Sequence, residues 1–135
     1  SDVFRAGIAG APVADWRDYD THYTERYLGV PTGDDDETYR RSSLLTWADG
    51  LRHPLLVLHG TADDNVYFLH GVRLSDALFR AGRTHEFIPL AGSTHSVADP
   101  AVHATVPDAS DAAKDPFRFQ STQPVTKPVP THASV

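Results

Sequence analysis

Residues 55–66 read LLVLHGTADDNV, and this stretch decides the fold. It opens with four consecutive apolar residues, Leu55 to Leu58, which follow Pro54 and precede His59-Gly60. A continuous apolar run of this length is typical of a strand covered on both faces, as in a parallel sheet. The sequence therefore predicts a buried parallel strand that leads directly into a polar loop.

The segments around this strand alternate between strand and helix patterns. Residues 67–81 have helical periodicity, and Gly82 stands where a C-cap glycine belongs. Residues 85–90 (HEFIPL) predict the next strand, in which Pro89 is tolerated only near the end or on an edge. Upstream, residues 6–13 predict a further buried strand. Strand, helix and strand joined by short connections predict an α/β fold with a mostly parallel sheet.

The composition narrows the possible functions. The chain has 135 residues, which is the size of one domain, and its formal net charge is −6. An acidic chain without a basic stripe is a poor binder of nucleic acid. It contains no cysteine, so disulfides and thiolate chemistry are excluded. Its apolar runs are too short to span a membrane. Neither a cytosolic nor a periplasmic or secreted location is favoured.

Two further regions have distinct compositions. In residues 14–50, four aromatic residues recur every three to four positions and could share one face of a short helix. They are Trp16, Tyr19, Tyr23 and Tyr27. The acidic run 34–37 predicts a solvated turn with charges at a helix N-terminus, with a cation site as the alternative. Residues 98–135 contain no Leu or Ile and predict a disordered, Pro/Ala/Thr-rich tail after a domain at 1–97.

The chemistry is expected at the carboxyl ends of the two downstream strands. Asp63 lies in the loop after residues 55–58, and His95 lies in the loop after residues 85–90. Consecutive parallel strands would bring these loops together at one sheet edge. A carboxylate beside an imidazole can orient it and stabilise its protonated form. The order acid then histidine is also that of α/β-hydrolases.

A purely structural interpretation of the same residues remains open. Asp64 or Asn65 could cap the helix predicted at 67–81, and His95 could be an ordinary loop residue. A metal site is not expected, because the eight histidines show no His-Glu-x-x-His or comparable spacing.

Three stretches together resemble the prolyl oligopeptidase family of serine peptidases, in its dipeptidyl peptidase IV-like branch. They are residues 11–16 (APVADW), 23–29 (YTERYLG) and 59–66 (HGTADDNV). The resemblance extends from about residue 3 to about residue 98. It implies the C-terminal portion of an α/β-hydrolase catalytic domain, with peptide substrates cleaved after a penultimate proline or alanine and with no cofactor.

The resemblance also implies roles for individual residues. Asp63 would be the triad acid and His95 the general base, while Asn65 would hydrogen-bond a substrate carbonyl. The remaining residues would line a proline pocket: Tyr19, Tyr23, Val13, Trp16 and Val66. Flat aromatic and apolar walls suit a proline ring.

The nucleophile of the family is missing from this sequence. No serine has a Gly-x-Ser-x-Gly setting, and the family's β-propeller is absent as well. The expected partner is therefore the missing N-terminal part of the catalytic domain, and the isolated chain is expected to be inactive. Two alternatives remain: a different α/β-hydrolase, such as an esterase or acylaminoacyl peptidase, and a non-catalytic module that folds against a partner.

Overall fold

A three-stranded parallel sheet forms the base of the molecule in the computed structural model, which describes residues 5–33 and 36–96. The strands are β1 (Gly7–Gly10), β2 (Leu55–Gly60) and β3 (His85–Leu90), in the order β1-β2-β3. Leu56 of β2 pairs with Ile8 on one side and with Glu86 on the other. The predicted α/β class with a parallel sheet is confirmed.

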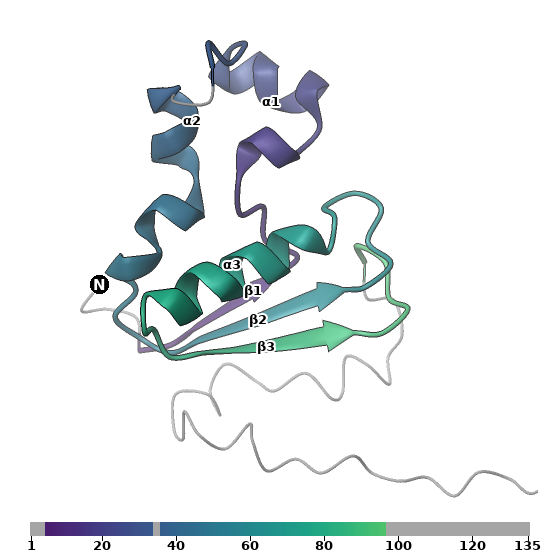
Figure 1. Cartoon of the computed structure of the whole chain (residues 1–135). Coiled ribbons are helices and arrows are strands. Elements are labelled where there is room, and N and C mark those ends of the chain that lie inside the picture. The colour runs from purple at the N-terminus through teal and green to yellow at the C-terminus, as the bar shows by residue number, and fades with distance from the viewer. Residues whose placement is uncertain (1–4, 34–35, 97–135) are drawn as a thin grey trace, which may run out of the picture.

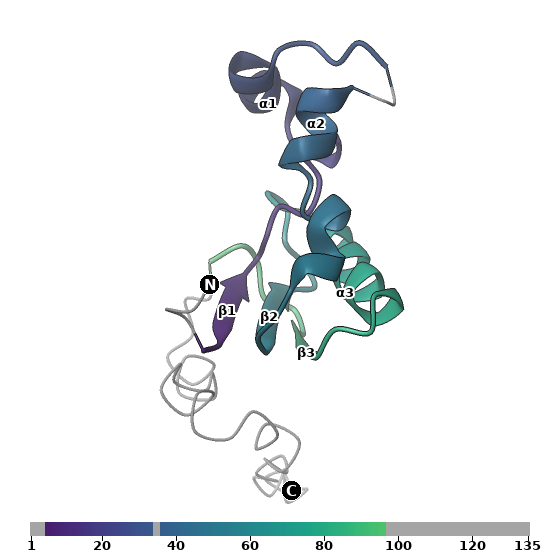
Figure 2. The same ribbon diagram turned by 90° about the vertical axis from the view of Figure 1, so that its left-hand side faces the viewer.

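The helix α3 (Leu69–Arg80) covers one face of this sheet, as Figure 1 shows. Val57 of β2 packs there against Leu74 and Leu78 of α3, and all three side chains are buried. The 3-10 helix η2 (Leu44–Gly50) packs against the same helix. In the view turned by 90°, α3 stands beside one face of the sheet, and no described helix covers the opposite face (Figure 2).

The chain between β1 and β2 makes a long excursion away from the sheet. It contains the 3-10 helix η1 (Trp16–Asp18), α1 (Thr21–Leu28) and α2 (Glu37–Ser42) before it returns through η2. Figure 1 shows α1 and α2 above the sheet, on the same side of it as α3. This excursion carries the aromatic residues that the sequence singled out.

The strand and helix predictions agree best with the structure in the unit β2–α3–β3. The strand at 85–90 is confirmed, and the strand predicted at 55–58 continues to Gly60. The predicted helix is shorter, since it begins at Leu69 and ends at Arg80. The proposal that Asp64 or Asn65 caps α3 is wrong, because Phe68 occupies the N-cap position without any side-chain cap bond.

Upstream, two predictions need correction. The strand predicted at 6–13 ends at Gly10, because Ala11 turns the chain with a φ of 43° and the proline that follows has no N–H to donate. The four aromatic residues do not share one helix. Trp16 lies in η1 and Tyr19 ends it, and Asp20 then starts α1 by accepting hydrogen bonds from two backbone N–H groups.

The acidic run and the tail are described only in part. Asp36 caps α2 by accepting from the N–H groups of Thr38 and Tyr39, and Glu37 lies in the first turn, as predicted. Asp34, Asp35 and the tail predicted at 98–135 lie outside the described residues.

Candidate active site

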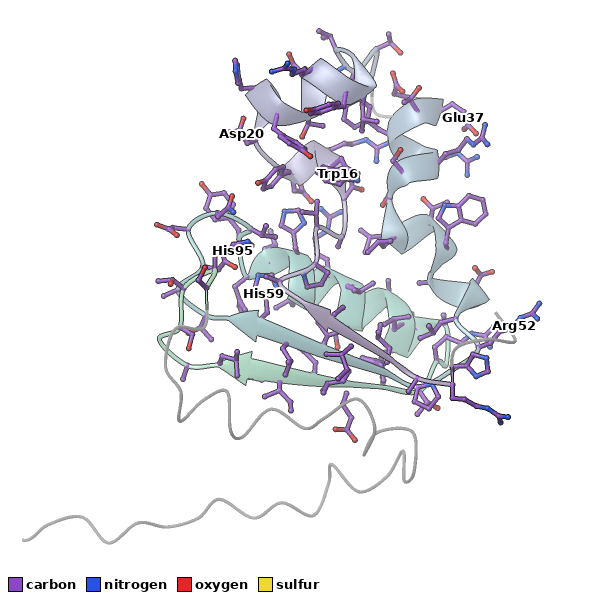
Figure 3. All side chains as sticks on the ribbon, turned by 180° about the vertical axis from the view of Figure 1, so that it is seen from behind. Trp16, Asp20, Glu37, Arg52, His59 and His95 are labelled. Atoms are coloured by element: carbon purple, nitrogen blue, oxygen red, sulfur yellow. The ribbon has the colours of Figure 1, made fainter. Side chains whose placement is uncertain are left out.

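Asp63 and His95 lie side by side at the carboxyl ends of β2 and β3. The Nδ1 atom of His95 is 3.0 Å from the Oδ2 atom of Asp63, although 32 residues separate them. Figure 3 shows His95 and His59 at the arrowhead end of the sheet, beneath the segment that carries Trp16. The sequence predicted this meeting of an acid and a histidine, and the structure brings the two side chains together.

The carboxylate of Asp63 is buried and held at both oxygens. Its Oδ1 accepts hydrogen bonds from the backbone N–H groups of Asn65, at 3.0 Å, and Val66, at 2.9 Å. Burial acts to raise the pKa of Asp63, but the hydrogen bonds from His95, Asn65 and Val66 outweigh it, so that the pKa lies below its ordinary value. The acid is therefore ionised and fixed in orientation before any ligand binds.

His95 is arranged to work as a base. Its Nδ1–H donates to the carboxylate, which leaves the lone pair of Nε2 free to take a proton. The imidazole remains 41% exposed, so that a reacting group can approach it. An ionised carboxylate behind the ring stabilises the imidazolium that forms when Nε2 is protonated.

The two loops that carry this pair are bonded to each other. The Thr61 N–H donates to the Leu90 carbonyl, at 3.0 Å, and the Ala62 N–H donates to the Ser93 carbonyl, at 3.1 Å. The Gly92 N–H in turn donates to the Thr61 hydroxyl, at 2.9 Å. These bonds set the position of one loop relative to the other.

Gly60 makes this close approach possible. A Cβ atom at this position would lie 2.3 Å from the Ser93 carbonyl oxygen and 2.6 Å from that of Thr94. The backbone that leads to His95 therefore crosses directly over the glycine. The sequence analysis read His59-Gly60 as a strand boundary and missed this packing role, which a glycine between a buried strand and an acidic loop could have indicated.

His59 is a second residue that the sequence analysis did not assign. Its imidazole is buried, and Nε2 lies 2.8 Å from the Val66 carbonyl and 3.5 Å from Oδ2 of Asp63. The Nε2–H thus closes the turn that holds Asp63. An alternating strand pattern places residue 59 on the α3 face, which was the available signal.

The predicted pocket residues fall into two groups. The rings of Trp16, Tyr19 and Tyr23 contact one another, with centroids 5.7–6.0 Å apart. We call these three rings the aromatic wall. The Tyr19 hydroxyl donates to Oδ1 of Asn65, at 2.9 Å, so the aromatic wall reaches the loop of Asp63. Val66 is 3% exposed, which places its side chain in the core.

Tyr27 extends the aromatic contacts, and Val13 stands apart from them. The Tyr27 ring lies 4.9 Å from that of Tyr23. Val13 is half-buried, one residue before the buried Ala14. The roles of these side chains toward a substrate stay predictions.

A cavity of about 280 Å³ opens beside the aromatic wall. Its lining combines Trp16 and Tyr19 with Arg17, Thr24 and Tyr39. Tyr23, Asn65 and Val66 do not line it, so it differs from the pocket that the sequence predicted.

Neither a metal centre nor a membrane span is found in the described part of the chain. Within residues 5–33 and 36–96, no three His, Asp or Glu side chains gather into a possible metal site. None of the helices described there is long and apolar enough to cross a bilayer.

Comparison with known proteins agrees with this arrangement. Residues 1–109 match the prolyl oligopeptidase family. Dipeptidyl peptidase 4 of Bos taurus is 41% identical over 105 residues, which are 76% of this chain and 14% of that protein. Prolyl endopeptidase FAP of Homo sapiens is 44% identical over 81 residues, which are 58% of this chain and 11% of that protein.

The fold is also found in solved structures. The crystal structure of Porphyromonas gingivalis dipeptidyl peptidase 4 matches with a TM-score of 0.69 and 36% sequence identity, covering 87% of this chain and 16% of that chain. This likeness confirms the α/β-hydrolase class of fold. The chain spans less than a fifth of the length of these relatives.

Proposed function

The chain belongs to the prolyl oligopeptidase family, and on that premise we propose that it supplies the acid and the base of a serine peptidase active site. The hydrogen bond between His95 Nδ1 and Asp63 Oδ2, joining the ends of consecutive parallel strands, carries this proposal. The nucleophile comes from outside this sequence, on the N-terminal part of the catalytic domain.

The reaction follows from the geometry of the pair. His95 Nε2 accepts the proton of a serine hydroxyl as that oxygen attacks the scissile carbonyl. Asp63 stabilises the resulting imidazolium, which then gives its proton to the departing amine. In the second half, His95 takes a proton from water as the water attacks the acyl-enzyme, and returns it to the serine.

The proposed substrates are peptides with proline or alanine before the scissile bond. Two of the relatives are named as a dipeptidyl peptidase and a prolyl endopeptidase. The contacting rings of Trp16, Tyr19 and Tyr23 offer the flat walls that such a side chain prefers, and Asn65, next to this wall, can orient a substrate carbonyl.

The test compares two polypeptides on Gly-Pro-p-nitroanilide: this chain alone, and the reading frame extended upstream until it includes a Gly-x-Ser-x-Gly segment. The chain alone should show no turnover, and the extended polypeptide should be active. In the extended form, Asp63→Asn should lower kcat by roughly 10⁴-fold, because the imidazole loses its orienting carboxylate.

Asp64→Asn is the matched control, because Asp64 is the exposed neighbour of Asp63 in the same loop. Its kcat should stay within about twofold of the unmodified enzyme. Equal losses in the two variants would contradict the role given to Asp63. Turnover by the chain alone that disappears with His95→Gln would show that the nucleophile lies within this sequence. Faster turnover of an acyl ester than of the proline amide would favour an esterase.

A further inference from the structure

His70 lies in the first turn of α3, between that helix and the segment that leaves β1. The residue is only 1% exposed. Its Nδ1 accepts a hydrogen bond from the backbone N–H of Ala14, at 3.2 Å, and its Nε2 lies 3.2 Å from the backbone carbonyl of Asp18. One imidazole thus joins both ends of residues 14–18 to α3.

These two contacts fix the protonation of the ring. A backbone N–H can only donate, so Nδ1 facing Ala14 must carry a lone pair. A carbonyl can only accept, so Nε2 facing Asp18 must carry the proton. The arrangement therefore requires the neutral imidazole in its Nε2–H form.

A second contact supports the same segment one helical turn further along. Arg73 forms an ion pair with the carboxylate of Asp18. Asp15 is buried and accepts hydrogen bonds from the backbone N–H of Arg17 and the hydroxyl of Ser43. None of these contacts involves the His70 ring, so protonation of Nδ1 acts directly on the bond to Ala14 and frees that end of the segment.

Residues 14–18 carry the aromatic wall toward the acid loop. The Trp16 ring meets the Tyr19 ring edge-on, at 5.7 Å between centroids. The Tyr19 hydroxyl then reaches Asn65, whose backbone N–H is bonded to Asp63. Residues 14–18 are thus joined to the side chain of Asn65 by a continuous path of contacts.

We propose that His70 is a positioning residue, which as a neutral imidazole holds the Trp16–Tyr19 wall against the loop of Asp63 and Asn65, and which releases that wall when it is protonated. The description of this wall as the substrate side rests on the proposed function. We call the two hydrogen bonds that join the His70 ring to Ala14 and Asp18 the latch. The latch itself depends only on these contacts of His70.

The charges around His70 determine the sign of the pH dependence. Burial lowers the pKa of His70, and the nearby His59 adds to this effect, whereas Asp15 and Asp63 act in the opposite direction without outweighing it. Asp18 contacts the ring through its backbone carbonyl, and its carboxylate forms an ion pair with Arg73. The neutral ring is therefore favoured by folding, and the latch opens as the pH falls from 6.5 through the lower pKa of the folded state.

The fluorescence of Trp16 reports the latch directly. The chain has two tryptophans, so Trp47→Phe leaves Trp16 as the single emitter. In this background, we expect one transition in the Trp16 emission below pH 6.5, while the far-UV circular dichroism stays constant. With His70→Gln, whose amide donates and accepts without titrating in this range, the transition should disappear.

His22→Gln is the matched control, because His22 is an exposed histidine on α1 and lies close to Trp16 in the sequence. Its transition should persist unchanged. A transition that survives in His70→Gln, or an unmodified chain whose Trp16 emission does not change, would overturn the proposal.

A second measurement avoids any substitution of the buried histidine. The ring nitrogens of His70 in the unmodified chain at pH 7.5 should show a protonated Nε2 and a lone pair on Nδ1 by ¹⁵N chemical shift. An Nδ1–H tautomer or a charged ring overturns the latch. Neither measurement involves hydrolysis, so a parent enzyme without peptidase activity would refute the proposed function alone.

Discussion

At the scale of single residues, two glycines with the same position in their strands have different neighbours. Gly60 ends β2 and Gly10 ends β1. A Cβ at Gly60 would collide with the backbone of residues 93–94, whereas a Cβ at Gly10 would meet no atom within 4 Å. Backbone cannot rotate aside as a flexible side chain can, so the collision must displace a whole loop.

Gly60→Ala should therefore lower the free energy of unfolding by about 3 kcal/mol or more, the upper end of the cost of overpacking. It should also push the loop of His95 away from Asp63. Urea unfolding measures the first effect, and the ¹⁵N shifts of the His95 ring report the second. Gly10→Ala should change the stability by less than about 0.5 kcal/mol. Equal destabilisation by the two substitutions would show that the crossing of the loops is not the cause.

A second prediction at the scale of residues concerns the carboxylate of Asp63 and the stability of the folded chain in acid. Because its pKa is lowered in the folded state, its contribution is fully present above the ordinary value of 3.8 and is lost as the pH falls through the lower, folded pKa. The difference in unfolding free energy between the unmodified chain and Asp63→Asn should thus be constant near neutral pH and shrink in acid. Asp64→Asn, at the exposed neighbour in the same loop, is the control, and the same slope in both variants would contradict the assignment.

At the scale of elements, the turn that ends α3 contains the glycine that the sequence analysis predicted there, Gly82. Gly82 takes a φ of 65°, the Arg83 N–H donates to the Leu78 carbonyl, and the Gly82 N–H donates to that of Phe79. Both bonds together make a Schellman motif, which needs a left-handed residue at this position.

Gly82→Ala should cost about 1 kcal/mol of stability, because a side chain disfavours this backbone conformation. Gly82→Asn should cost less, since asparagine adopts it more readily. The midpoints of urea unfolding rank the three chains. A Gly82→Ala chain as stable as the unmodified one would mean that the helix end is not anchored by this turn.

Some elements of the fold could be predicted from the sequence and others could not. The unit β2–α3–β3 could be predicted, because an apolar run, a helical period and a terminal glycine are local signals. The end of β1 could not, because the positive φ of Ala11 leaves no mark in the sequence. The spacing of Trp16, Tyr19, Tyr23 and Tyr27 suggested one helix, since it does not reveal that Asp20 starts a new helix between them.

The candidate site also has features that could be predicted from the sequence and features that could not. Asp63 and His95 could be paired from their places after consecutive strands. Gly60 and His59 carried local signals of a role, but the backbone that they contact could not be predicted, and neither could that contacted by His70, because it is distant in sequence or belongs to another element. Sequence patterns report periodicity and local turns, and they are silent on which loop crosses which glycine.

At the scale of the whole molecule, the sheet has one face and two edges that no described element covers. Val57 points toward α3, so Leu56 and Leu58 point to the opposite face. Ile8, the register partner of Leu56, is 37% exposed on the outer strand β1. Burial raises the pKa of Glu86, which pairs with Leu56 from the other side. Leu56 and Leu58 are themselves buried, so the exposed apolar side chain is that of Ile8 on the edge strand β1, and an apolar residue on an open strand edge favours association.

The chain alone should therefore self-associate as its concentration rises, which light scattering after size-exclusion chromatography can measure. Ile8→Lys should reduce this association, because it places a charge on the exposed strand. Tyr27→Lys is the control: Tyr27 is even more exposed but lies on α1, away from the sheet. A monomer at all concentrations, or equal effects of the two substitutions, would contradict the prediction.

The hydrogen bonds between the loops after β2 and β3 have a consequence for the timing of synthesis. All of these bonds, and the bond between Asp63 and His95, lie within one strand–helix–strand unit, β2–α3–β3. In a parent polypeptide that carries its serine upstream, this unit leaves the ribosome after the nucleophile does. On the proposed function, such a parent would lack its general base until translation has passed His95.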